Sequence, residues 1–492
     1  MSTSLPYTPL YINGQPVKTT QTFDILTPGS LKPVGTCASA SSQNCQDAIS
    51  AAHNAFKGWS QTSISTRIRI FTRAAELLEE SGGEDWKNRI ITSITEETGA
   101  SLEMGLFNYA TAPSFLRSSA STITTQLAGR TFPSSRSPNI DVYTEKHPLG
   151  VIFTQSPWNA PIALTLRAIT IPILCGNTVV FRPSEISPRS CAIVYEVLKA
   201  AGLPDGVFNF LSIRKEDTPS LTAEIIADSR VRKVTFTGSD RVGKIIAMEC
   251  AKHLKPCVLE LGGKAPAIVL DDAPVGVAAK QILAGATMHS GQICMSTERV
   301  IVQRGVVEEF TEELLKVARE LRDKGSGGLG TLFAETHAEN VVEMIREAQV
   351  RGGAQVLLGD VKREGSVVGP HVLLMDEDKS RKKGLGIWER ESFGPVLTLT
   401  TVDTVQEAID AANDSDYSLT SSVWTKDLYL ARKIAKAVRA GYTNINGSTI
   451  HSEPVLGLIG LGYAPSNHIS YNAYANGPHL LTAAHPATAA SA

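Results

Sequence analysis

The sequence predicts an α/β protein built around parallel sheets. Four apolar segments read as strands: Val151–Thr154, Thr178–Phe181, Val207–Leu211 and Val231–Phe236. Their first residues lie 27, 29 and 24 positions apart, close to the roughly 30 residues of a strand–helix–strand unit. These segments are mostly continuous apolar runs, which is typical of parallel strands that helices cover on both faces. Sheets of this kind bind nucleotide cofactors at the carboxyl ends of their strands.

The regions on either side of these strands also show regular patterns. Before them, a short strand is expected at Leu10–Ile12. A helix that ends at Gly82-Gly83 is also predicted, because apolar residues recur at steps of three and four and form one face: Ile64, Ile68, Phe71, Ala75 and Leu78. After them, a second α/β region is expected. Its helices are predicted near 275–289, 306–322, 336–351, 404–412 and 427–439, and its strands at Glu298–Val302, Gln355–Leu358, Val396–Thr401 and Ser421–Thr425. Residues 481–492 are mostly Ala, Thr, Pro and Ser, which predicts a disordered tail.

Composition favours a cytoplasmic protein with no affinity for nucleic acids or membranes. The chain has 492 residues, 42% of them hydrophobic, and a net charge of −2, so it can build large cores in two to four domains and lacks a general attraction to anionic surfaces. No apolar run is long enough for a membrane span, and the N-terminus lacks the features of a secretory signal. Seven cysteines without CxxC spacing predict reduced thiols and neither a disulfide framework nor a metal site.

The most informative segment runs from Val258 to Val300. It contains Glu260 in Leu-Glu-Leu-Gly-Gly-Lys and, 34 residues later, Cys294 in Gly-Gln-Ile-Cys. A thiolate can attack a carbonyl carbon, and a carboxylate can then activate water against the acyl intermediate. The other cysteines read as small buried residues, and His289, five residues before Cys294, reads as structural.

Two segments after predicted strands suit a dinucleotide. Gly238-Ser239-Asp240-Arg241-Val242-Gly243 opens a helix that continues through Lys252; the amides and dipole of that helix favour an anion such as a pyrophosphate. Arg182 and Glu185 follow another strand, where a carboxylate can accept ribose hydroxyls. In isolation the first segment also fits an ordinary capped turn, because GxGxxG and P-loop patterns are absent, and Glu185 also fits a turn acid.

Two further segments carry candidate polar and aromatic groups. Pro157-Trp158-Asn159-Ala160-Pro161 follows the first strand, and its amide can donate to a developing oxyanion; a plain turn asparagine is the alternative. Glu391-Ser-Phe393-Gly-Pro precedes a strand. There the carboxylate can hold a ribose and the aromatic ring can lie beside a nicotinamide, or the segment is a surface turn with a core phenylalanine.

Taken in order and spacing, these segments resemble the NAD(P)-dependent aldehyde dehydrogenase superfamily from about Leu10 to Pro454. The resemblance implies Cys294 as nucleophile, Glu260 as general base and Asn159 as oxyanion donor. It also implies cofactor contacts from a larger set: Trp158, Arg182, Glu185, Gly238, Ser239, Asp240, Arg241, Val242, Gly243, Glu391 and Phe393. No metal is implied. Segments around Trp158–Arg167, Trp388–Pro395 and Asn446–Pro454 look most like the salicylaldehyde/vanillin dehydrogenase group.

The resemblance also implies a fold: a Rossmann-like cofactor-binding domain, an α/β catalytic domain and a small β oligomerisation arm. We expect the NAD-binding domain at 1–124 and 148–260, the catalytic domain at 261–445, and the oligomerisation or bridging segment at 125–147 and 446–480. The expected assembly is a homodimer or homotetramer, weakened if the C-terminal segment cannot pair, because the sequence after Pro454 departs from the family pattern.

The implied reaction is oxidation of an aldehyde to its carboxylic acid through a cysteine thiohemiacetal and thioester. Ala160 stands where many members carry an aromatic residue, which favours an aromatic or bulky aldehyde. Arg182 stands where the family usually has lysine and suits a 2′-phosphate, whereas Glu185 repels one. NAD⁺ is therefore expected, with NADP⁺ left open. The alternatives are a relative impaired by its atypical C-terminus and a cysteine hydrolase or acyltransferase without redox chemistry.

Overall fold

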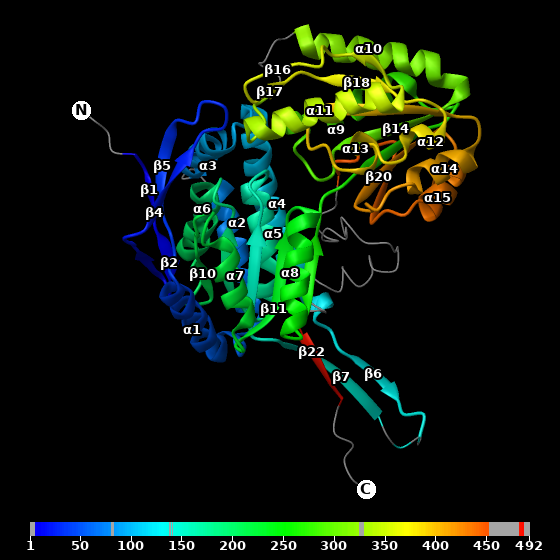
Figure 1. Cartoon of the computed structure of the whole chain (residues 1–492). Helices are drawn as coiled ribbons and strands as arrows, with labels where there is room; N and C mark the ends of the chain where they lie inside the picture. Colours follow the sequence, from blue (N-terminus) through cyan, green and yellow to red (C-terminus); the bar gives the residue numbers. More distant parts are fainter. Residues whose placement is uncertain are drawn as a thin grey trace.

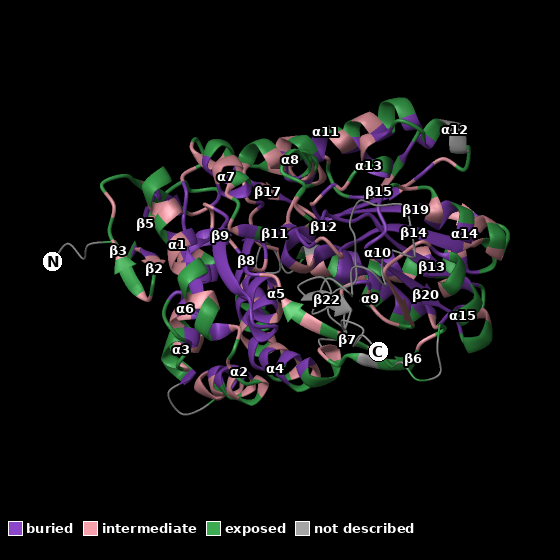
Figure 2. Cartoon of the chain, turned by 90° about the horizontal axis from the view of Figure 1, so that it is seen from below, coloured by how far each residue is buried: buried purple, intermediate pink, exposed green. Residues whose placement is uncertain are grey.

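Two seven-stranded sheets form the framework of the protein (Figure 1). The computed structural model describes residues 5–79, 83–136, 139, 141–323, 329–451 and 482–486. In Figure 1 the first sheet and its helices, blue to green, lie beside the second α/β unit, coloured from green through yellow to orange. Figure 2 shows the strands of both sheets mainly in the colour of buried residues, with exposed residues on the outer helices. The predicted α/β class is confirmed.

The first sheet is parallel except at one edge. Its strands are, in spatial order, β12 (Cys257–Glu260), β11 (Val231–Thr237), β8 (Val151–Ser156), β9 (Thr178–Pro183), β10 (Phe208–Phe210), β2 (Leu10–Ile12) and β3 (Gln15–Val17). Strands β12 to β10 run parallel, and β2 and β3 are antiparallel additions. The predicted strands are confirmed within two residues at each end.

Helices cover both faces of this sheet, which explains its unbroken apolar strands. One face carries α2 (Ile64–Glu79), α3 (Gly83–Thr98), α4 (Leu102–Gln126), α5 (Pro161–Leu174) and α6 (Pro188–Ala200), and the other carries α1 (Ser42–Trp59), α7 (Thr218–Ala227) and α8 (Asp240–Lys252). On β8, Ile152 packs into the first core, whereas Val151 and Phe153 pack into the second. Each strand therefore needs apolar side chains at successive positions.

The second sheet is also mixed. In spatial order it contains β15 (Gln355–Leu358), β18 (His371–Leu374), β19 (Val396–Val402), β14 (Thr297–Gln303), β13 (Ala265–Val269), β20 (Thr420–Trp424) and β21 (Tyr442–Ile445). Only the pair β15–β18 is antiparallel. Its helical segments are α9 (Val275–Thr287), η1 (Met288–Gly291), η2 (Arg304–Val306), α10 (Val307–Asp323), α11 (Glu335–Gly352), α12 (Lys379–Lys382), α13 (Gly386–Glu389), α14 (Val405–Asn413) and α15 (Leu428–Ala437). The predicted helices and strands of this region are confirmed, except that the helix expected to reach 289 ends at Thr287.

Three small sheets complete the described structure. They are formed by β1 (Tyr7–Thr8), β5 (Pro33–Ala38) and β4 (Thr22–Leu26); by β16 (Arg363–Glu364) and β17 (Val367–Val368); and by β22 (Thr482–Pro486), β7 (Asp141–Pro148) and β6 (Arg130–Pro133). The last sheet is an arm that projects from the body of the molecule (Figure 1). The strands near the N-terminus other than β2 were not predicted, because they are short and depend on their partners.

The disordered tail predicted for 481–492 is wrong at its start. Thr482–Pro486 forms β22, which pairs antiparallel with β7. An exposed strand edge pairs through backbone groups, so even a sequence of low β-propensity can add to it. Residues 487–492 lie outside the described part, as do residues 452–480 of the predicted bridging segment.

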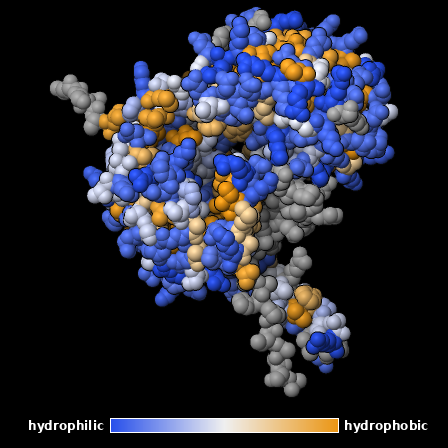
Figure 3. All heavy atoms as spheres, in the orientation of Figure 1, coloured by the Kyte–Doolittle hydropathy of each residue, from blue (hydrophilic) through white to orange (hydrophobic). Residues whose placement is uncertain are grey.

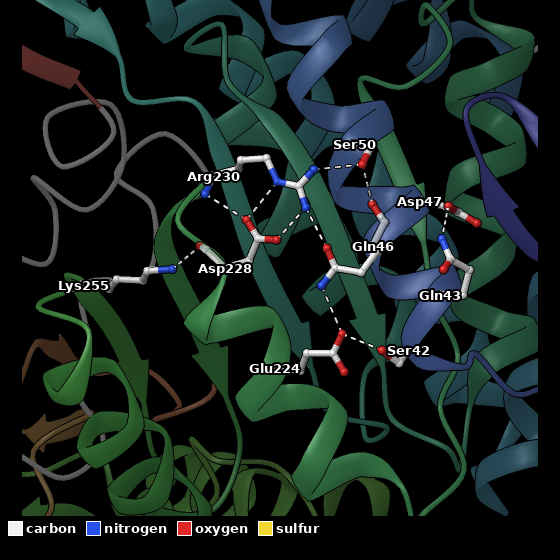
Figure 4. A network of polar contacts seen from close by, with 9 residues as sticks. All are labelled: Ser42, Gln43, Gln46, Asp47, Ser50, Glu224, Asp228, Arg230 and Lys255. Carbon is white, nitrogen blue, oxygen red and sulfur yellow. Dashed lines mark hydrogen bonds and ion pairs between the residues drawn. The ribbon is translucent and has the colours of Figure 1, made fainter.

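A polar network ties α1 to the turn between α7 and β11 (Figure 4). The Arg230 guanidinium donates to Ser50 Oγ at 2.8 Å, to Gln46 Oε1 at 2.7 Å and to Asp228 Oδ1 at 2.9 Å. Gln46 Nε2 in turn donates to Glu224 Oε1 at 3.0 Å. The network fixes the start of β11, whose other end leads into α8.

Among the described helices, none is long and apolar enough to cross a membrane.

Candidate active site

Four loops meet where the two large sheets approach each other. The segment 157–160 follows β8, and 261–264 links β12 to β13. The segment 288–296 links α9 to β14, and 390–395 precedes β19. Strands β8 and β12 belong to one parallel set, so their carboxyl ends lie at the same edge of the sheet.

The loop that carries Cys294 has a tightly turned backbone. After α9 the chain passes through left-handed conformations at His289 (φ 51°), Ser290 (φ 57°) and Gly291 (φ 77°). A Cβ added to Gly291 lies 2.1 Å from the Gly394 carbonyl oxygen, so only glycine allows this loop to touch the 390–395 loop. The sequence predicts an ordinary helix end here. Packing against the 390–395 loop imposes the left-handed backbone conformations instead.

Gln292 anchors the same loop from its other side. Its Nε2 donates to the carbonyl of Thr331 at 3.2 Å, and its Oε1 accepts the Phe333 N–H at 2.9 Å. The Gln292 carbonyl accepts a hydrogen bond from Asn159 Nδ2 at 2.9 Å. Because this bond joins the Asn159 loop to the Cys294 loop, two residues predicted from separate motifs lie in one site.

The paired glycines after Glu260 allow two backbone contacts. A Cβ on Gly263 lies 2.0 Å from the Cys294 carbonyl oxygen. Gly262 has a φ of +72°, and a Cβ there lies 2.7 Å from the Glu391 carboxylate. The Gly263 N–H also donates to Glu391 Oε1 at 2.9 Å. Glycine at both positions therefore brings the Glu260, Cys294 and Glu391 loops together.

Glu260 ends β12 and is bound by Arg167, a residue of α5 that was not predicted to take part. Arg167 Nη1 donates to both carboxylate oxygens, at 2.9 and 3.0 Å. The two side chains are only 23% and 10% exposed, so solvent screens this pair weakly. A sequence signal existed: Arg167 is the one charged residue in an otherwise apolar helix.

The surroundings of Cys294 favour a protonated thiol. Cys294 is partly buried, and burial is the largest cause that raises the pKa of its thiol. The negative charge of Glu260 raises this pKa further, the charge of Arg167 lowers it, and that of Glu391 raises it. The six other cysteines lie elsewhere in the fold and are free thiols.

His289 does not form a Cys–His pair. Burial lowers its pKa to about 4, and neither ring nitrogen has a hydrogen-bond partner among the described residues. Its ring meets Trp158 edge to face, with centroids 5.8 Å apart. Trp158 also contacts Phe393 edge to face, at 6.0 Å. The loop that carries Asn159 therefore packs directly against the loop that carries Glu391 and Phe393.

The 391–393 loop is partly buried and strained. Burial, followed by the charge of Glu298, raises the pKa of Glu391 to about 8, and the Gly263 N–H acts in the opposite direction. Phe393 has a φ of 49°, in the left-handed region that L-residues other than glycine rarely adopt. Its carbonyl lies 3.0 Å from His337 Nε2.

The glycine-containing segment forms the start of α8, as predicted. Ser239 caps the helix, since its side chain accepts from the Val242 N–H. The Gly238 N–H donates to the Glu260 carbonyl at 3.0 Å, and a Cβ on Gly243 lies 2.2 Å from the Leu261 side chain. These contacts hold the helix start against the Glu260 loop.

Asp240 and Arg241 differ in their surroundings. Asp240 Oδ2 lies 3.6 Å from Arg390 Nη1, which links the start of α8 to the 390–395 loop. Arg241 is exposed and makes no ion pair among the described residues. Of the α8 residues predicted for the site, Arg241 is therefore the one that no contact ties to the rest.

Arg182 and Glu185 pair at the end of β9. Arg182 Nη2 donates to Glu185 Oε2 and to Thr218 Oγ1, both at 3.1 Å. Arg182 Nε is buried and has no partner among the described residues. The pair lies at the same sheet edge as Asn159 and Glu260, although no contact joins it to them.

Within the described part of the chain no cluster of residues suits a metal ion.

Known proteins resemble this chain over most of its length. The model of the aldehyde dehydrogenase family matches residues 16–466. A vanillin dehydrogenase from Pseudomonas sp. (strain HR199 / DSM 7063) is 37% identical over 93% of this chain and 94% of its own length. A salicylaldehyde dehydrogenase from Pseudomonas sp. (strain C18) is 34% identical over the same shares. The crystal structure of a salicylaldehyde dehydrogenase from Pseudomonas putida G7 complexed with salicylaldehyde superposes with a TM-score of 0.87 and 32% identity, covering 98% of this chain and 97% of that one.

Proposed function

This chain belongs to the aldehyde dehydrogenase family, and we propose that it oxidises an aldehyde to the carboxylic acid through a covalent intermediate on Cys294. The observation that carries the proposal is the backbone contact between the loops of Glu260, Cys294 and Glu391, which Gly262, Gly263 and Gly291 make possible. A nucleophile, a carboxylate and a cofactor loop are thereby brought to one site.

The residues present fit the nicotinamide dinucleotide that the family uses. Arg182 Nε is buried and has no partner within the described ranges of the chain, which suits a polar ligand at the end of β9. The start of α8 offers backbone N–H groups and a positive dipole end to a pyrophosphate. Glu391 and Phe393 would hold the nicotinamide end, beside Trp158. When bound, the dinucleotide supplies a hydride acceptor for the carbon attached to Cys294.

Three residues carry the covalent steps of the proposal. The Cys294 thiol releases its proton to solvent and adds as a thiolate to the aldehyde carbon, and Asn159 and the Cys294 backbone N–H stabilise the oxyanion. An amide nitrogen has two hydrogens; that of Asn159 uses one for Gln292, and the second serves the oxyanion. After loss of hydride, the carbon is a thioester. Glu260 takes a proton from water, the water oxygen attacks the thioester, and the carboxylic acid leaves as Cys294 regains its proton.

Arg167 is a positioning residue in this scheme. It binds both oxygens of Glu260, and each oxygen keeps a further lone pair that can accept water. The bonds from Arg167 keep the carboxylate pointed along one direction. Loss of Arg167 should therefore impair thioester hydrolysis more than aldehyde binding.

We infer an aromatic aldehyde as substrate and NAD⁺ as the preferred cofactor. Ala160 beside Asn159 leaves room for a ring, and relatives that cover most of the chain are named for vanillin and salicylaldehyde. Glu185 accepts a hydrogen bond from Arg182. Its negative charge therefore offsets the positive charge that the guanidinium would offer to a 2′-phosphate. NADP⁺ binding requires this pair to break.

We further propose a homodimer or homotetramer in the cytoplasm. Figure 3 shows apolar side chains gathered over the region of α5 and α8, and more on the arm. Exposed apolar residues include Ile245 and Met248 of α8, Leu254 after it, and Phe132 and Tyr143 of the arm. Such patches mark interaction surfaces, and the unpaired edges of the arm sheet can extend it. Seven free thiols fit a reducing compartment.

The test is an assay of the purified full chain with vanillin, salicylaldehyde and benzaldehyde, each with NAD⁺ and with NADP⁺. Formation of reduced cofactor together with the carboxylic acid supports the proposal. Binding of NAD⁺ without turnover indicates the impaired relative, and ester cleavage without reduced cofactor indicates the hydrolase or acyltransferase; either result contradicts the proposal. Light scattering in the same buffer tests the assembly.

A further inference from the structure

Glu298 is a buried acid that joins three of the active-site loops without belonging to any predicted motif. It lies on β14, four residues after Cys294, and is only 2% exposed. Its carboxylate accepts the Ser392 N–H at 3.0 Å through each oxygen and the Phe393 N–H at 3.3 Å. The same carboxylate pairs with Lys264, which follows Gly262-Gly263. One side chain therefore contacts both the Glu260 loop and the 391–393 loop.

The strained residue Phe393 is held by two polar contacts, one to Glu298 and one to His337. A left-handed φ is unfavourable for an L-residue, and strain of this kind persists only where the surroundings over-determine the conformation. The Phe393 N–H donates to Glu298 and its carbonyl lies against His337 Nε2. These two contacts hold the backbone of Phe393 in its left-handed conformation from both sides.

Stability alone does not explain a charged pair at this position. Replacing a buried ion pair by apolar residues of similar volume is often neutral or stabilising, because desolvation offsets the attraction. Glu298 and Lys264 are nevertheless fully enclosed, with side chains 3% and 1% exposed. A carboxylate differs from an apolar residue in accepting several N–H groups at once, and here those groups belong to the loop that faces the cofactor.

We propose that Glu298 is a positioning residue that fixes residues 391–393 in the conformation that binds the nicotinamide end of the cofactor. The inference rests on the proposed function, since it assigns the 391–393 loop to that cofactor. Lys264 balances the charge of Glu298, and His337 holds the far side of Phe393.

Glu298 also acts on Glu391 through its charge. Six residues influence or neighbour the Glu391 carboxylate: Glu298, Lys264, Asp240, Tyr417, Cys294 and Arg390. Among the charged groups, Glu298 contributes most to raising the pKa of Glu391. A neutral residue at position 298 should therefore lower this pKa. A purely structural role predicts no such change.

The experiment compares wild type, Glu298→Gln and a matched control, Glu97→Gln. Glu97 is a fully buried acid that likewise accepts two backbone N–H groups, those of Arg189 and Ser190, at 2.9 and 2.8 Å, and neither of these residues is predicted to bind substrate or cofactor. NAD⁺ affinity is measured by calorimetry between pH 6 and pH 9.5, together with the KM for each substrate. A glutamine has a single acceptor oxygen with two lone pairs, so it cannot accept the Ser392 N–H, the Phe393 N–H and Lys264 at once.

The expected result is specific to the cofactor. Glu298→Gln should weaken NAD⁺ binding by about tenfold to a hundredfold, the size of effect that a small misplacement produces, with a much smaller change in the KM of the aldehyde. The pH midpoint of NAD⁺ binding should fall below the wild-type value. Glu97→Gln should keep both the affinity and the midpoint. If Glu298→Gln fails to fold, the charge-balanced Lys264→Met/Glu298→Gln double variant is measured and the same two changes are expected.

Two failures can be told apart. If the wild type neither binds NAD⁺ nor oxidises aldehydes, the proposed function is wrong. If the wild type does both, and the Glu298 variants match its NAD⁺ affinity and pH midpoint, the proposed function stands and the positioning role of Glu298 is overturned. An equal loss in Glu97→Gln also overturns it, because a general loss of stability then explains the effect.

Discussion

Replacing Glu260 by glutamine should separate the two halves of the reaction. The amide has nearly the same shape but is a poor base, so thioester hydrolysis loses a general-base contribution of about 10²- to 10⁴-fold. This corresponds to about 3 to 5 kcal/mol of barrier. In the structure the carboxylate takes hydrogen bonds of 2.9 and 3.0 Å from Arg167 Nη1, and glutamine keeps one acceptor oxygen. The fold should lose no more than about 1 to 2 kcal/mol.

The assay is rapid mixing of the variant with NAD⁺ and an aromatic aldehyde. A burst of about one NADH per active site is expected, followed by a steady-state rate lower by the factor above. The intact mass of the protein should increase by one acyl group, which hydroxylamine removes. Glu196→Gln is the matched control, because Glu196 also pairs with an arginine, Arg89, away from the site. A full steady-state rate with no acyl adduct would falsify the role of Glu260.

Three further outcomes are expected. Cys294→Ala should abolish NADH formation while NAD⁺ still binds; substantial NADH formation contradicts the nucleophile assignment. Alkylation of Cys294 by iodoacetamide should accelerate as pH rises beyond 9. At a given pH the reaction should be faster than wild type in Glu260→Gln and slower in Arg167→Gln, because Glu260 raises and Arg167 lowers the thiol pKa. Equal rates in the three proteins contradict this electrostatic account. Burial raises the pKa of Glu391 from 4.5 to about 8 in the folded protein, so its contribution to stability is complete below pH 4.5 and is lost as pH rises through 8. Urea unfolding of Glu391→Gln without cofactor should therefore show a shallower decline over that range, and an unchanged decline rules out Glu391 as its source.

The order of elements and the main site residues could be predicted because their signals are local. Continuous apolar runs at regular spacing identified β8, β9, β10 and β11. The segments of Glu260, Cys294 and Asn159 were singled out by their residue types and by the glycines or prolines beside them, and the structure brings these segments together. Periodicity and glycine placement depend on the residues themselves and their immediate neighbours, so they can be read without knowing the fold.

The partners of those residues could not be predicted in the same way. Arg167 reaches Glu260 across 93 positions and Glu298 reaches Ser392 across 94, and nothing in either local pattern names the other. Strand β22 was missed for a related reason, since its pairing depends on the free edge of β7. Both cases depend on which surfaces the fold brings together.

Local chemistry along the chain was sufficient for the α/β class, because helices, strands and tight turns follow from short-range sterics and apolar spacing. The roles of Cys294, Glu260 and Asn159 came from the family resemblance of their motifs and stay predictions. Only the folded chain decides which charges meet: Arg167 with Glu260, and Lys264 with Glu298. Such pairs form across long stretches of sequence, and their energies depend on burial and distance, which are properties of the packed structure.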